Sequence, residues 1–92
     1  MSEFSGQDRP CLARGTRLQW DEARQRHMLL YPEGALALNG TAAAILELCD
    51  GEHTLASIVA TLQARYPGAA IDEDVRDLLA RIGETGLVHA AR

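Results

Sequence analysis

Residues 31–51 read Tyr-Pro-Glu-Gly-Ala-Leu-Ala-Leu-Asn-Gly-Thr-Ala-Ala-Ala-Ile-Leu-Glu-Leu-Cys-Asp-Gly, and the hydrophobic period changes within them. Residues 34–38 alternate small and large side chains, which is typical of a strand. After Thr41 the apolar residues recur at helical spacing. Asn39 lies between the two patterns, where its side-chain oxygen can cap a helix. The stretch therefore predicts a last strand that leads directly into a first helix.

Two further strands are expected upstream. Residues 16–21 alternate in polarity and residues 27–31 are mostly apolar, so the two predict an antiparallel hairpin, with Trp20 packed against the core. Pro32 and Gly34 predict a turn between the second strand and the third, which spans residues 34–38. Residues 1–11 are polar and are predicted to form a flexible N-terminal tail, which leaves residues 12–92 as a single domain.

Helical periodicity dominates the downstream half. It predicts helices at about residues 40–50, 54–66 and 72–85. Gly51 is expected to end the first helix, while Thr54 and Asp72 are expected to cap the second and third. Each helix has one apolar stripe, so the helices should pack together and against the sheet. The predicted class is α+β, with a three-stranded antiparallel sheet followed by a three-helix bundle.

The charge distribution bears on nucleic-acid binding. Residues 1–31 carry five Arg and four acids, whereas residues 32–92 carry four Arg and nine acids. Residues 45–66 have the form of a helix-turn-helix, and strands beside it would resemble a winged helix. A winged-helix DNA-binding regulator is therefore the alternative function. The acidic helical half argues against it, because phosphate binding needs a basic face.

The sequence contains no recognisable catalytic or metal-binding motif. His27, His53 and His89 are far apart in sequence and form no metal-ligand spacing. We therefore expect a protein that is not an enzyme and that needs no metal or cofactor. Cys11 and Cys49 are expected to be reduced thiols in a cytoplasmic protein, with Cys49 buried in the first helix. No apolar run approaches the length of a membrane span.

The last strand offers a binding surface of another kind. A three-stranded sheet of sequential hairpins leaves an edge unpaired, and an extended peptide can add to such an edge. Ala35 and Ala37 have small side chains, so the face of the strand that carries them leaves room for a partner. The sequence is equally compatible with an edge that binds nothing and that Pro32 and Glu33 merely protect from pairing with another strand.

Three segments carry a family resemblance. They are Leu30-Tyr31-Pro32-Glu33-Gly34, Leu38-Asn39-Gly40-Thr41 and Ile45-Leu46-Glu47-Leu48-Cys49-Asp50-Gly51. Together they resemble the pyrroloquinoline-quinone (PQQ) biosynthesis protein D family, PqqD, over about residues 12–89. The family often has a bulky or basic residue where this chain has Ala37.

The resemblance implies a winged-helix-like domain that acts as a non-catalytic peptide chaperone in PQQ biosynthesis. Such a recognition element for ribosomally made peptides would bind a PqqA-like precursor peptide by strand addition. It would present that peptide to a PqqE-like radical S-adenosylmethionine (SAM) enzyme. The implied binding residues form the strand edge and a wall on the third helix: Pro32, Glu33, Gly34, Ala35, Leu36, Ala37, Leu38, Val75, Leu78, Leu79 and Ile82.

The open edge also bears on self-association. The hinge at residues 38–40 joins the strands to the helices, and an open edge beside a hinge favours strand exchange. We expect a monomer in dilute solution and a strand-exchanged dimer at high concentration.

Overall fold

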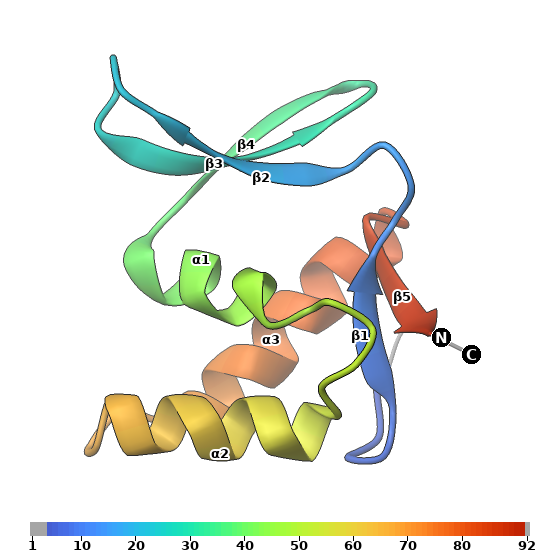
Figure 1. Ribbon diagram of the computed structural model, residues 1–92, viewed down its shortest axis with the longest axis vertical. Coiled ribbons are helices and arrows are strands. Elements are labelled where there is room, and N and C mark those ends of the chain that lie inside the picture. The colour runs from blue at the N-terminus through green and yellow to red at the C-terminus, as the bar shows by residue number, and fades with distance from the viewer. Residues whose placement is uncertain (1–3, 92) are drawn as a thin grey trace.

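The computed structural model describes residues 4–91. Its larger sheet has three antiparallel strands in the order β2-β3-β4, comprising β2 (Arg17–Asp21), β3 (Arg26–Tyr31) and β4 (Gly34–Leu38). β3 therefore forms the centre, and β2 and β4 form the edges (Figure 1). The hairpin between β3 and β4 closes on the pair Tyr31 and Gly34, with Pro32 and Glu33 in the turn.

Three helices follow the sheet: α1 (Gly40–Glu47), α2 (Leu55–Arg65) and α3 (Ile71–Glu84). α1 lies between the three-stranded sheet and α2, and α3 runs beside them (Figure 1). The α1 N-cap is Asn39 and the α2 N-cap is Thr54, each with its side chain accepting a backbone N–H, as predicted. The observed architecture confirms the α+β class.

The start of α3 differs from the prediction. Asp72 is not its cap, because the helix begins one residue earlier, at Ile71. Its N-cap position is Ala70, which has no side chain able to accept a hydrogen bond. Asp72, Glu73 and Asp74 instead occupy the first turn, where their negative charges favour the positive end of the helix dipole.

The end of α1 also differs. The helix stops at Glu47, with Leu48 as its C-cap, so Gly51 is not its terminating glycine. Gly51 has a φ of +81° and its N–H donates to the carbonyl of Pro10 at 3.0 Å. The left-handed conformation that glycine permits is thus used to join this loop to the N-terminal segment.

The largest difference from the prediction is at the N-terminal segment, which was expected to be a flexible tail. Of residues 1–11, residues 1–3 lie outside the described part, but Arg9–Leu12 form strand β1, which pairs antiparallel with β5 (Val88–Ala91). Pro10 is fully buried, and Leu55 donates its N–H to the carbonyl of Asp8 at 2.8 Å. The segment is ordered because strand and loop partners from distant parts of the chain satisfy its backbone.

The core is aliphatic and lies between the sheet and the helices. Leu29 and Leu38 contribute from the sheet, and all three helices contribute leucine or isoleucine. Trp20 does not join it, contrary to prediction: its side chain is 45% exposed at the end of the β2–β3 hairpin. There the indole N–H donates to Glu22 at 2.8 Å and the ring stacks edge-on against His27.

Candidate functional site

The edge of β4 that faces away from β3 has no strand partner within residues 4–91. Antiparallel pairs alternate between those that exchange backbone hydrogen bonds and those that do not, and a two-residue hairpin closes on a bonded pair. Counting from Tyr31 and Gly34, the next bonded pair is Leu29 with Leu36. The N–H and C=O groups of Ala35 and Ala37 therefore point outward, and both residues are exposed.

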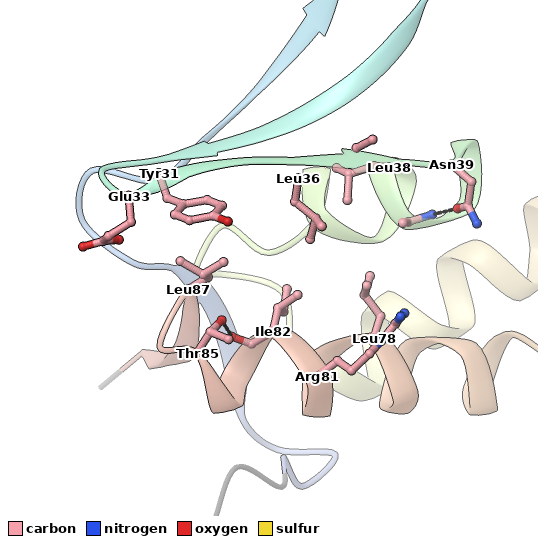
Figure 2. A pocket seen from close by; sticks show the side chains of 12 residues that line it. Tyr31, Glu33, Leu36, Leu38, Asn39, Leu78, Arg81, Ile82, Thr85 and Leu87 are labelled. Atoms are coloured by element: carbon pink, nitrogen blue, oxygen red, sulfur yellow. Dashed lines mark hydrogen bonds between the residues drawn. The ribbon is translucent and has the colours of Figure 1, made fainter.

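A cavity of about 490 Å³ lies between this edge and the C-terminal half of α3 (Figure 2). Figure 2 shows Leu36 pointing from β4 toward Ile82 of α3, across the middle of the cavity. Leu36 is 40% exposed, which is unusual for a leucine on the inner face of a sheet. The cavity is lined by residues of both elements and their flanking loops: Tyr31, Glu33, Leu36, Ala37, Leu38, Asn39, Ala42, Leu78, Arg81, Ile82, Thr85 and Leu87.

Most of the predicted binding residues come together here. From the strand, Glu33, Leu36, Ala37 and Leu38 line the cavity. From the helix, Leu78 and Ile82 line it and form its largely buried floor.

Five predicted residues do not line the cavity. Pro32 lies in the turn between β3 and β4, and Gly34 and Ala35 are the first two residues of β4. Val75 and Leu79 face the core, where both are almost completely buried, so their side chains support the wall from behind. Helical spacing does not separate them from the lining residues, because Leu78 follows Val75 and Ile82 follows Leu79 by three residues, within one apolar stripe.

Six lining residues were missed by the sequence prediction: Tyr31, Asn39, Ala42, Arg81, Thr85 and Leu87. Arg81 and Thr85 follow Leu78 and Ile82 by three residues, so the helical spacing alone would have placed them on the same face. Helical spacing could not have identified Leu87, because it lies beyond the end of α3. It reaches the cavity because the chain reverses at Gly86, whose φ is +78°, and the N–H of Leu87 donates to the carbonyl of Ile82.

A second, smaller cavity of about 250 Å³ adjoins the first beyond Asn39. It shares four lining residues with the first: Asn39, Ala42, Leu78 and Arg81. Its other residues include Asp74 and Asp77, from the first half of α3. The surface along α3 thus changes from apolar at Ile82, through a cation at Arg81, to acidic at Asp77.

The two cysteines lie outside this region. Both are free, and burial raises the pKa of the Cys49 thiol to about 12, so it stays protonated at neutral pH. Within residues 4–91 no group of three potential metal ligands is present. The same residues include no helix that is long and apolar enough to cross a membrane.

The arrangement fits an extended polypeptide. Outward backbone groups at Ala35 and Ala37 can form a ladder with another strand. Alternate side chains of that strand would then enter the cavity between Leu36 and Ile82.

Comparison with known proteins gives a consistent result. Residues 26–88 match the family model described as coenzyme PQQ synthesis protein D (PqqD). Similar proteins include the PqqA binding protein of Methylococcus capsulatus, 59% identical over 68% of this chain and 68% of that protein. The PqqA binding protein of Azotobacter vinelandii is 50% identical, over 86% of this chain and 87% of that protein.

Two solved structures are also similar. The PqqD portion of PqqCD from Methylobacterium extorquens, described as a stand-alone recognition element for ribosomally synthesised, modified peptides, aligns with a TM-score of 0.81. It is 37% identical, and the alignment covers 96% of both chains. PqqD from Xanthomonas campestris aligns with a TM-score of 0.55 at 35% identity, over 84% of this chain and 88% of that one. With the family model and these relatives in agreement, the chain belongs to the PqqD family.

Proposed function

We propose that this protein is a non-catalytic peptide chaperone of PQQ biosynthesis that binds a PqqA-like precursor as an added strand on β4. The bound segment forms a ladder with the outward groups of Ala35 and Ala37, and its alternate side chains enter the cavity toward Ile82. The relatives named PqqA binding proteins and the recognition element of Methylobacterium extorquens support this function. A cytoplasmic location is part of the proposal.

The observation that carries the proposal is the position of the open edge directly beside a largely apolar cavity. An edge alone supplies four backbone groups at Ala35 and Ala37, each bond adding roughly 0.5–1.5 kcal/mol net. Covering one or two apolar side chains adds about 1.5–3 kcal/mol each. After the entropy of ordering the peptide, this is compatible with an affinity on the order of micromolar.

The size of the site supports a role in presentation. β4 has five residues, and at about 3.4 Å per residue an added strand of that length spans roughly 17 Å. Only a short segment of a precursor is therefore covered, and the remainder stays free for a modifying enzyme. We propose a PqqE-like radical SAM enzyme as that partner.

The DNA-binding alternative receives no support from the comparisons. The face that α3 exposes carries Asp72, Glu73, Asp74 and Asp77. These carboxylates would repel phosphates.

The testing experiment is a titration of the ¹⁵N-labelled protein with a synthetic PqqA peptide, followed by amide chemical shifts. The largest changes are expected in residues 34–38 and in α3 near Ile82. A parallel titration with duplex DNA should give no saturable shifts. Shifts confined to α2 with DNA, and none with the peptide, would overturn the proposed function.

The proposed oligomeric state remains a monomer with an exchanged dimer at high concentration. The sheet joins the helices at Asn39, and residues 13–16 form a second connection, between β1 and β2. Both segments must rearrange for β2–β4 to exchange between chains. A tight dimer in sedimentation at low micromolar concentration would contradict this expectation.

A further inference from the structure

Arg81 is the one residue with a positive side chain among those that line either cavity. It lies on α3 between Leu78 and Ile82, the two residues that form the cavity floor, and it is exposed. Figure 2 shows its side chain beside Leu78, below the strand end that carries Leu38 and Asn39. A guanidinium therefore lies at one end of a largely apolar groove, and Glu33 lies at the other end.

No ion pair or side-chain hydrogen bond engages this guanidinium within residues 4–91. The ion pairs in that part of the chain are Arg24–Asp21, His53–Asp50 and Arg76–Asp72. Asp77 precedes Arg81 by four residues, a spacing at which helix pairs form, yet it is not bonded to it. On the same helix Arg76 does pair with Asp72 at 3.0 Å over that spacing. The Arg81 side chain thus remains available to a ligand.

We propose that Arg81 determines specificity by pairing with a carboxylate side chain of the bound precursor peptide. This inference rests on the proposed function, because it needs a strand in the groove. Arginine suits the task, since its planar fork can donate two parallel hydrogen bonds to one carboxylate.

The surroundings fix where that carboxylate sits along the peptide. Beyond Arg81, Asp74 and Asp77 line the smaller cavity and would repel an acidic side chain placed there. In the other direction, Leu36 and Ile82 provide an apolar contact. Strand side chains that share a face are two residues apart. The bound segment should therefore carry an acidic residue two positions from an apolar one.

The test is a double-mutant cycle between protein and peptide. Arg81→Gln is compared with wild type and with Arg65→Gln, an exposed arginine on α2 outside both cavities. Each Asp and Glu of a synthetic PqqA peptide is changed in turn to Asn or Gln, and every Kd is measured by calorimetry. Arg81→Gln should weaken binding about fivefold, and Arg65→Gln should leave it unchanged.

At one acidic peptide position, the change to Asn or Gln should weaken binding to the wild-type protein by about the same factor. The same change should not weaken binding to Arg81→Gln any further. Arg81→Glu combined with Lys at that peptide position should restore part of the affinity. Equal binding by wild type and Arg81→Gln, or losses that simply add at every acidic position, would overturn the inference while the proposed function stands. Absence of peptide binding to the wild-type protein would remove the proposed function as well.

Discussion

The Oδ1 atom of Asn39 accepts the backbone N–H of Ala42 at 2.7 Å. This bond closes the first turn of α1 at the residue that directly follows β4. It thereby fixes the angle at which the strand enters the helix, and with it the position of the open edge beside α3. Both residues also line the cavity, so the residues that form the cap are part of the binding surface.

Asn39→Ala should lower the free energy of unfolding by about 1 kcal/mol, because the N-cap bond is lost. It should also weaken peptide binding, since the strand is no longer held at a fixed angle. Thr54→Ala is the matched control: it removes the equivalent cap of α2, whose Oγ1 accepts the N–H of Ser57 outside the cavity. Denaturant unfolding and calorimetric Kd values check both. Equal effects of the two variants on binding would contradict this role of Asn39.

Ala37→Pro should abolish peptide binding while the fold survives. Proline removes the outward N–H of the edge, whereas the hydrogen bonds to β3 come from Leu36 and its alternate neighbours. Ala37→Ser keeps both the N–H and a small side chain and should retain binding, so it serves as the control. The circular dichroism of all three proteins should agree. Full binding by Ala37→Pro would contradict strand addition at this edge.

Leu36→Ala should weaken peptide binding by about tenfold, or about 1.5 kcal/mol, because its exposed apolar surface would no longer be covered by the peptide. Its effect on stability should be small, since the side chain is 40% exposed in the free protein. Trp20→Ala, which removes a comparably exposed apolar side chain on the opposite edge strand, should leave the Kd unchanged. A similar loss in both variants would show that the cavity is not the contact.

The Cys49 thiol predicts a pH dependence of stability. Burial raises its pKa from 9.0 to about 12, so between these values the folded state keeps a proton that the unfolded state releases. Stability attributable to this group is therefore complete below pH 9 and falls as pH rises toward 12, by at most about 1.4 kcal/mol per pH unit. Urea unfolding from pH 8 to 11 should give a steeper decline for wild type than for Cys49→Ala. Parallel declines would contradict the burial argument.

Removing residues 1–12 should reduce the free energy of unfolding by roughly 2 kcal/mol or more. The deletion breaks the β1–β5 pairing, exposes the site of buried Pro10, and leaves the N–H of Gly51 without its acceptor. Thermal unfolding measures the effect. An unchanged melting temperature would mean that the N-terminal segment is a free tail after all.

Local patterns predicted the parts of this fold that local forces determine. The alternation in residues 34–38 and the caps at Asn39 and Thr54 depend on neighbours within four residues, and the sequence contains that information directly. The open edge followed from counting strands. The resemblance to PqqD then linked that edge to a peptide.

Long-range pairing explains what was missed. Residues 9–11 look like part of a polar tail because their partners, Val88–Ala91 and residues 49–51, lie far away in sequence. The same limit hid Leu87, which reaches the cavity only after the turn at Gly86. Val75 and Leu79 were assigned to the cavity because one apolar stripe on α3 serves both the core and the groove, and periodicity does not divide them.

The most direct test of strand addition is hydrogen exchange at two amides of β4. In the free protein the N–H groups of Ala35 and Ala37 should exchange rapidly, whereas that of Leu36, bonded to β3, should be protected. On saturation with the PqqA peptide, Ala35 and Ala37 should become protected and Leu36 should stay so. If both alanine amides still exchange rapidly when the peptide is bound, it does not add to this edge, and the account is wrong.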